Sequence, residues 1–241
     1  MLIPRAQQKE HVKKIEQTVI DFLAEEIYST KENLMMIMGI TTRQGFVKAI
    51  KRLIEPGYVQ EHTIRVLGSM MKVYGITYAG LGVAFADEPY HKSKAFQASR
   101  ISQWTMAHHL GLQKCRLIFE QQYPGCRWTN GDYLDVSKSE KRPDALLKID
   151  GKKYAIEFER TFKSQKRYQG IMASYLKKHS QIQAEKVLYI SENQSMATKL
   201  KSCFKGIDYV NIEQKRYRLE PRHYDRFTFV SLDNVANLAL S

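Results

Sequence analysis

The residues with the clearest potential for chemistry are Asp144, Glu157, Glu159 and Lys163, three acids followed by a base within one short stretch. Carboxylate oxygens are the ligands that hard divalent cations prefer. A cation held in this way lowers the pKa of a bound water and stabilises charge on an attacked phosphodiester. We therefore predict that the three carboxylates hold Mg2+ or Mn2+.

The spacing of these acids predicts that they share one face of a β-hairpin. Asp150-Gly151 suits a two-residue hairpin turn between the apolar runs 145–149 and 154–158. With such a turn, Asp144 lies directly opposite Glu157, and Glu159 points to the same face. Opposed carboxylates destabilise a sheet unless positive charge lies between them, which favours a cation.

A second interpretation of the hairpin needs no metal. Glu159 then pairs with Arg142, its own cross-strand neighbour, and the acids are simply solvated. A three-residue loop or a bulge would also break the predicted register. In both interpretations Ile156 and Phe158 point away from the acids and into the core.

This stretch also carries a family resemblance. Pro143-Asp144 followed by Glu157-Phe158-Glu159 resembles the PD-(D/E)xK signature of restriction-endonuclease-like nucleases, with Glu159 where that family usually has lysine. The variant, behind an N-terminal winged helix, is similar to the MobC-type plasmid mobilisation relaxases of the replication–relaxation family. The resemblance implies that Asp144 and Glu157 hold the metal, that Glu159 is a further ligand or orients the attacking group, and that Lys163 neutralises charge on the phosphate.

The overall charge indicates a polyanionic partner. The 241 residues include 38 Lys and Arg against 25 Asp and Glu, a formal net charge of +13. The basic residues are spread through folded-looking segments, which favours a nucleic-acid surface over a lipid-binding tail. We predict a cytoplasmic protein without a membrane partner. The sequence has three cysteines without metal-ligand spacing, and it contains neither an apolar run long enough for a membrane helix nor a signal peptide.

The first 88 residues are predicted to form a winged helix-turn-helix. A helix over 9–28, a capping box starting at Ser29, and a third helix capped by Thr41 or Thr42 are followed by two alternating segments at 58–66 and 72–78. The third helix has an apolar stripe that includes Val47. Its other face is predicted to bind double-stranded DNA through Arg43, Gln44, Lys48, Lys51 and Arg52. A winged helix used for protein contacts is the alternative.

Residues 89–241 are predicted to form the nuclease-like domain, so the fold class is α/β (α+β), with a mixed sheet flanked by helices. Residues 89–122 form bridging helices, interrupted near Gly111. A turn is predicted at 80–82, at the end of the first domain. The other predicted elements of the second domain are a first strand at 133–136, a helix at 162–179, strands at 186–190, 209–212 and 226–232, and a helix at 194–204. Lys166 and Arg167 are predicted to bind the phosphate backbone.

The adjacent His108-His109 cannot chelate one metal well, because neighbours on a helix point about 100° apart. The resemblance implies a histidine in this region, which makes one of the pair a candidate to face DNA. A relaxase usually forms a covalent link to DNA through a tyrosine. Tyr168 and Tyr175 lie seven residues apart on a similar face of the helix predicted after the site, but neither is assigned this role.

The resemblance implies a relaxase that nicks one strand at a plasmid transfer origin for conjugative mobilisation, helped by an accessory mobilisation or coupling protein. Two alternatives remain open. One is a hydrolytic restriction-like or repair endonuclease with the same active site. The other is a non-catalytic replication initiator or repressor, in which the winged helix acts alone.

Overall fold

The computed structural model describes residues 4–66, 69–86, 94–137, 140–177 and 181–240. The chain divides into two compact units, unit 1 (Met1–Gln113) and unit 2 (Lys114–Ser241), so the division falls inside helix α5 (Gln103–Gln122). The boundary predicted between residues 88 and 89 lies outside the described residues. Helix α5 runs without a break through Gly111, where the sequence predicts an interruption.

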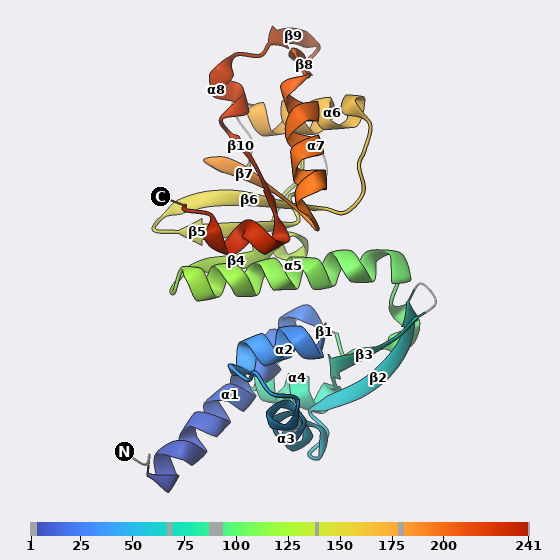
Figure 1. The fold of residues 1–241 in the computed structure, drawn as a ribbon, viewed down its shortest axis with the longest axis vertical. Coiled ribbons are helices and arrows are strands. Elements are labelled where there is room, and N and C mark those ends of the chain that lie inside the picture. Colours follow the sequence, from blue (N-terminus) through green and yellow to red (C-terminus); the bar gives the residue numbers. More distant parts are fainter. Residues whose placement is uncertain (1–3, 67–68, 87–93, 138–139, 178–180, 241) are drawn as a thin grey trace. The chain divides into compact units, whose positions relative to one another are not determined.

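Unit 1 combines helices with a small antiparallel sheet (Figure 1). Among its described residues the sheet has three strands, in the order β1–β3–β2. The predicted helices and the two long strands are present, and the short strand β1 is an addition. The elements before α5 are α1 (Arg5–Glu26), β1 (Tyr28–Thr30), α2 (Lys31–Met38), α3 (Arg43–Ile54), β2 (Val59–Val66), β3 (Ser69–Ile76), α4 (Tyr78–Ala84) and the 3-10 turn Ala98–Arg100.

The starts of α2 and α3 follow from the hydroxyl residues before them. Thr42 caps α3 by accepting a hydrogen bond from the Gly45 amide at 3.1 Å, as predicted. Thr30 caps α2 by accepting one from the Asn33 amide at 3.4 Å. The predicted capping box starting at Ser29 is therefore wrong by one residue, because the cap is Thr30, the last residue of β1.

Residues 80–82 lie in helix α4, so the predicted turn is wrong. The Thr77 side chain caps this helix by accepting from the Gly80 amide at 3.1 Å. A Cβ atom at Gly80 would lie 2.3 Å from the carbonyl oxygen of Tyr58, so this glycine permits a close approach between α4 and the start of the sheet.

Unit 2 is built on a mixed sheet (Figure 1). Its described residues give five strands in the order β10–β7–β6–β5–β4, with β5 antiparallel to both neighbours and β7 parallel to both. The remaining pair, β8 and β9, forms a separate antiparallel hairpin. The elements are β4 (Arg127–Asn130), β5 (Ala145–Ile149), β6 (Lys152–Glu159), α6 (Gln165–Leu176), β7 (Lys186–Ser191), α7 (Gln194–Lys205), β8 (Tyr209–Ile212), β9 (Lys215–Arg218), α8 (Pro221–Tyr224) and β10 (Phe227–Ser231), with 3-10 turns at Gly131–Tyr133 and Leu232–Asn237.

The first strand of the sheet is β4, not the predicted segment 133–136. The β-forming residues Trp128 and Thr129 pair with Leu147 and Leu146 of β5. None of the described helices is long and apolar enough to cross a membrane.

Helices α6 and α7 lie on one side of the five-stranded sheet (Figure 1). The core under them includes Ala155 of β6 and Tyr189 of β7. Since side chains alternate along a strand, Glu157 and Glu159 point to this same helix-covered face. Ile156 and Phe158 are buried on the opposite face, as predicted. The side chains on both faces of β6 are therefore buried.

Candidate active site

The β5–β6 hairpin has the predicted two-residue turn and the predicted register. Asp150 and Gly151 both have positive φ, 48° and 84°, as a tight hairpin turn requires. Ala145 lies opposite Ile156, and the Asp144 amide extends the ladder by donating to the Ile156 carbonyl at 3.0 Å. Asp144 is thus next to Glu157 across the strands.

Glu157 is buried, with 6% of its surface exposed. The Lys141 ammonium lies 2.5 Å from Oε1 of Glu157, and the Tyr175 hydroxyl donates a hydrogen bond to the same oxygen. Burial raises the pKa of Glu157, and the negative charge of Asp144 raises it further, while Lys141 and Tyr175 oppose this rise. The net direction is upward, so Glu157 holds a proton more readily than an exposed glutamate.

Glu159 is buried beside Glu157, with 4% of its surface exposed. Its Oε2 atom accepts a hydrogen bond from the Lys163 ammonium at 2.7 Å. Burial, assisted by the charge of Glu159, raises the pKa of Tyr168 to about 12. The alternative pairing of Glu159 with Arg142 is not formed, because the Arg142 guanidinium donates instead to the Val136 carbonyl at 3.5 Å.

Asp144 is oriented by the backbone of the neighbouring strand. Its Oδ2 atom accepts a hydrogen bond from the Phe158 amide at 2.8 Å. This bond fixes the orientation of the Asp144 carboxylate, and Asp144 lies across from Glu157 in the hairpin. In this position the negative charge of Asp144 contributes to the raised pKa of Glu157.

The three acids are not arranged as one metal group. Within the described parts of the chain, no set of three or more His, Cys, Asp or Glu side chains could hold a metal ion. The predicted trio of Asp144, Glu157 and Glu159 is therefore not brought together, and Glu159 is tied to Lys163. Asp144 and Glu157 remain an adjacent pair, which fits an ion such as Mg2+ that takes one or two carboxylates. Lys141 would have to release Glu157.

Two partners of Glu157 were not identified from the sequence, Lys141 and Tyr175. Lys141 lies in the segment before β5, and only the closed hairpin brings it to the second strand. Tyr175 and Tyr168 do share one face of α6, and both are buried under that helix. Tyr168 accepts a hydrogen bond from the Lys163 amide at 3.0 Å. Neither tyrosine presents an exposed hydroxyl to a DNA strand.

Tyr189 of strand β7 is a further tyrosine near the two glutamates. It lies opposite Glu157 in the parallel β6–β7 pair and is fully buried. Its hydroxyl has no hydrogen-bond partner among the described residues. Burial raises the pKa of Tyr189 well above its usual value, and Glu157 and Glu159 raise it further.

The predicted DNA-binding face of α3 is exposed in unit 1. Arg43, Gln44, Lys48 and Lys51 are all exposed, and Lys51 forms an exposed ion pair with Glu55 at 3.4 Å. Such a pair contributes little to stability and leaves the lysine available.

Two residues of α3 differ from their predicted positions. Val47 was placed in the apolar stripe but is 53% exposed, on the same side as Arg43 and Lys51. Arg52 donates to Glu16 of α1 at 2.5 Å and to the Lys48 carbonyl at 3.3 Å. Arg52 thus ties α3 to α1.

In unit 2, Lys166 and Arg167 are exposed in the first turn of α6. Helix α6 begins at Gln165, capped by Ser164, and not at residue 162 as predicted. The predicted end of this helix at residue 179 lies outside the described residues.

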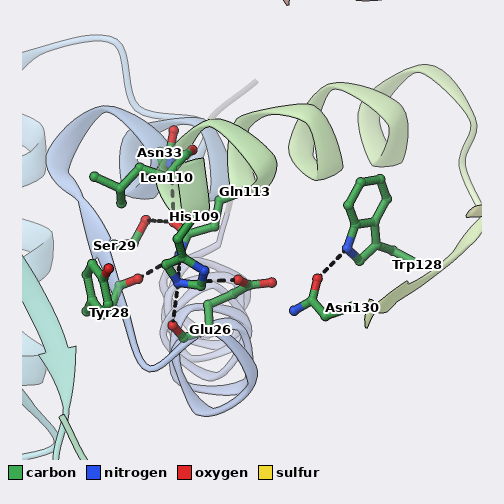
Figure 2. Close-up of polar contacts among 9 residues, drawn as sticks. All are labelled: Glu26, Tyr28, Ser29, Asn33, His109, Leu110, Gln113, Trp128 and Asn130. Carbon is green, nitrogen blue, oxygen red and sulfur yellow. Dashed lines mark hydrogen bonds and ion pairs between the residues drawn. The ribbon is translucent and has the colours of Figure 1, made fainter. Parts of the chain in front are cut away.

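His109 belongs to a buried polar network in unit 1 (Figure 2). Its Nε2 atom lies 2.9 Å from the Glu26 carbonyl oxygen and 3.7 Å from the Glu26 carboxylate. Gln113 donates to the Tyr28 carbonyl at 2.7 Å, and its Oε1 accepts from the Ser29 hydroxyl at 2.6 Å. These bonds hold the first half of α5 against β1, so His109 has a structural role in unit 1.

A separate hydrogen bond in Figure 2 belongs to unit 2, where Trp128 Nε1 donates to Asn130 Oδ1 at 2.7 Å. This bond lies within strand β4. The Trp128 ring also stacks on Phe119 of α5, with ring centroids 6.3 Å apart. The second half of α5 is thereby packed against the edge strand of the sheet, next to the hairpin that carries Asp144.

The candidate site is therefore a buried pair of glutamates, each with one lysine and one tyrosine from outside the strand, together with Asp144 at the open end of the hairpin. Comparison with protein-family models, curated proteins and solved structures finds no match to this chain.

Proposed function

We propose that this chain is a DNA endonuclease of the relaxase type, which binds a plasmid origin of transfer and nicks one strand in a metal-dependent reaction for conjugative mobilisation. The observation that carries the proposal is the placement of Asp144 directly beside Glu157, with the Lys141 ammonium at 2.5 Å from the glutamate. Paired carboxylates with a neighbouring cation suit hydrolysis of a phosphodiester.

The proposed DNA-binding part is unit 1, taken as a winged helix-turn-helix. Three helices followed by the two long strands β2 and β3 are in the order that this motif requires. Helix α3 would enter the major groove, where Arg43 and Gln44 at its first turn reach base edges and the lysines meet phosphates. Val47 lies among them and is suited to contact a thymine methyl group.

The proposed catalytic part is unit 2, taken as a restriction-endonuclease-like fold. Its support is the mixed sheet flanked by helices and the hairpin that bears the acids. Asp144 and Glu157 would hold Mg2+ or Mn2+, which supplies an activated water and electrostatic stabilisation of the attacked phosphate. Lys163, kept in place by Glu159, would neutralise charge on that phosphate. Glu159 would then orient Lys163, a role that differs from both roles predicted for it, a further metal ligand or the orienter of the attacking group.

A non-catalytic replication initiator or repressor is the second candidate, and one observation favours it. Each glutamate is buried and already has a lysine at 2.5–2.7 Å. Buried carboxylates that are neutralised in this way also occur as purely structural pairs. In this case the winged helix alone would carry the function.

A supercoiled plasmid that carries the candidate origin separates these functions. The wild type and Glu157→Gln are incubated with it in Mn2+ or in EDTA, with and without an accessory mobilisation or coupling protein. Open circles from the wild type alone, only with Mn2+, support the relaxase. Linear products point to a hydrolytic restriction-like or repair endonuclease. Equal binding by both proteins without any cleavage overturns the nuclease proposal and leaves the initiator or repressor.

The matched control for Glu157→Gln is Glu192→Gln. Glu192 lies just after β7 in unit 2 and pairs with Arg160 at 2.5 Å, but its side chain is 45% exposed. Both variants remove one acid that is paired with a base. A loss of nicking that is confined to Glu157→Gln therefore points to the site rather than to the charge of unit 2.

A further inference from the structure

The β8–β9 hairpin of unit 2 carries a concentration of positive charge that the proposed nicking site does not use. All four residues of β9 are exposed, and three of them are basic: Lys215, Arg216 and Arg218. The fourth, Tyr217, is 47% exposed. Basic residues interleaved with aromatic rings are typical of surfaces that bind single-stranded nucleic acid.

A cavity of about 510 Å3 lies at the base of this hairpin. This volume falls within the range of about 300–1,000 Å3 that is typical of small-molecule sites. The cavity is lined by Asp208, Tyr209, Arg216, Arg218, Leu219 and Tyr224. It therefore combines two guanidinium groups, two aromatic rings and one carboxylate.

Arg216 is held in an orientation that suits an anion. Its guanidinium lies 3.6 Å from the centre of the Tyr209 ring. Stacking uses the flat face of the guanidinium and leaves the N–H groups at its edge available. Among the described residues neither Arg216 nor Arg218 forms an ion pair with a carboxylate within 4.0 Å, in contrast to Arg222 nearby, which pairs with Glu220 at 2.9 Å.

The other lining residues suit a base more than a bare anion. The Tyr224 ring is anchored because its hydroxyl donates to the Ile207 carbonyl at 2.8 Å. An aromatic ring fixed in this way offers a surface for stacking. Asp208 would repel a free phosphate, but its carboxylate can accept hydrogen bonds from the exocyclic amino group of a base.

We propose that this cavity binds one nucleotide of single-stranded DNA, with Arg216 and Arg218 on its phosphate, a tyrosine ring against its base and Asp208 on an amino group of that base. The proposal rests on the function proposed above and extends it, since nicking and unwinding of a duplex produce a single strand that must be held. A cavity accepts an unstacked base, which duplex DNA does not offer, whereas α3 is suited to the duplex.

The test measures fluorescence anisotropy of a labelled single-stranded oligodeoxynucleotide titrated with the full chain at fixed salt. Arg216→Ala and Arg218→Ala are each expected to weaken binding by about 10-fold, the effect of losing one good phosphate or stacking contact. Arg222→Ala removes the same charge from a side chain that is 76% exposed and already paired. It is expected to change binding by less than about twofold.

Arg216→Lys separates a built site from general attraction. Lysine keeps the charge but lacks the planar fork that stacks on Tyr209, so most of the loss should remain. Full recovery of binding in Arg216→Lys, or an equal loss in Arg222→Ala, overturns the proposal. Circular dichroism of each variant checks that the exposed substitutions leave the fold unchanged.

Competition with small ligands tests whether a nucleotide is recognised. We expect dCMP and dAMP, whose bases carry amino groups, to displace the oligonucleotide at concentrations where inorganic phosphate does not. Equal displacement by phosphate overturns the assignment of a nucleotide site.

Duplex binding and nicking are measured on the same preparations. If the duplex is bound and nicked but the arginine variants match the wild type on single strands, only the present inference fails. If the wild type binds neither form of DNA, the proposed function fails.

Discussion

The Lys141 ammonium lies 2.5 Å from the Glu157 carboxylate, and the Tyr175 hydroxyl donates to the same oxygen. The segment before β5 and helix α6 therefore converge on one buried atom of β6. A buried carboxylate with two such donors is stabilised only while both are present, because removing one leaves an incompletely compensated charge. The relationship has consequences for stability that can be measured without any assay of activity.

Replacing Lys141 by Met should destabilise unit 2, and more so at pH 8 than at pH 4. Without the ammonium, the pKa of Glu157 rises further. At pH 8 the unfolded state has an ionised Glu157, so folding must bury an unpaired charge or take up a proton. At pH 4 the carboxyl is largely protonated in both states, and the difference shrinks. Urea denaturation should show a loss of about 3 kcal/mol at pH 8.

Lys72→Met is the control for that experiment. Lys72 pairs with Glu61 at 2.7 Å, but the lysine side chain is 62% exposed. Exposed pairs contribute about 0–1 kcal/mol, so this variant should lose far less than Lys141→Met. An equal loss in the two variants at pH 8 would mean that Lys141 is no more important than a surface lysine.

Glu157→Gln should change the pH dependence of the free energy of unfolding. The change should be opposite in sign to that caused by removing an acid whose pKa an ion-pair partner lowers. The pKa of Glu157 is raised in the folded state. Its contribution to stability is therefore complete at pH values below the usual pKa of glutamate, and it declines as the pH rises from there through the pKa of Glu157 in the folded protein. The variant lacks this titration. Its stability relative to the wild type should therefore increase between pH 4 and pH 8, as measured by urea denaturation at several pH values.

Glu192→Gln, the exposed control, should keep a more constant difference from the wild type over the same pH range. A wild type that gains stability relative to Glu157→Gln as pH rises would contradict the prediction. Such a result would mean that Lys141 and Tyr175 outweigh burial and hold the pKa of Glu157 below its usual range.

The β5–β6 hairpin could be predicted because its turn residues strongly favour a two-residue turn. Asp150-Gly151 tolerates the two positive φ angles that a two-residue turn imposes, so the register followed, and with it the juxtaposition of Asp144 and Glu157. The β8–β9 hairpin has the same kind of turn at Glu213 and Gln214, with φ of 51° and 66°. These residue types rarely adopt that conformation, so no sequence signal marked the second strand.

The partners of the acids were harder to predict, because they come from tertiary packing. Arg142 was the predicted cross-strand partner of Glu159, but its guanidinium donates to the Val136 carbonyl. Glu159 pairs instead with Lys163, which lies in the loop after β6. Local patterning fixes which face of a strand a side chain takes. It does not say which elements will cover that face, and in the folded chain both glutamates are buried, with Tyr175 of α6 in contact with Glu157.

Gly75→Ala should destabilise unit 1, because β3 passes closely under an aromatic ring. A Cβ atom at Gly75 would lie 2.2 Å from Cγ of Phe96, whose amide is hydrogen-bonded to the Ile76 carbonyl at 2.8 Å. The ring has to move, at a cost of about 1–3 kcal/mol. Thermal unfolding should show a lower Tm.

Gly82→Ala is the matched control for this substitution. It adds the same methyl group within helix α4, where nothing beyond the adjacent residues and the helix's own backbone lies within 4 Å of the added Cβ. Alanine should raise stability by about 0.5–1 kcal/mol, because glycine is a poor helix former. If both alanine variants change the Tm in the same direction, the close contact between Gly75 and Phe96 does not govern the stability of unit 1.

Arg43→Ala and Arg52→Ala remove the same charge from one helix but should act in different ways. Arg43 is exposed at the first turn of α3, so its loss should weaken binding to duplex DNA and reduce the slope of log K against log salt by about 1. Arg52 is engaged with Glu16 at 2.5 Å, so its loss should lower the free energy of unfolding by about 1 kcal/mol and change the salt slope less. Duplex binding at several salt concentrations, with urea denaturation of the same proteins, measures both effects. A larger change of slope for Arg52→Ala would place the DNA on the α1 side of α3 and not on the face that carries Arg43 and Val47.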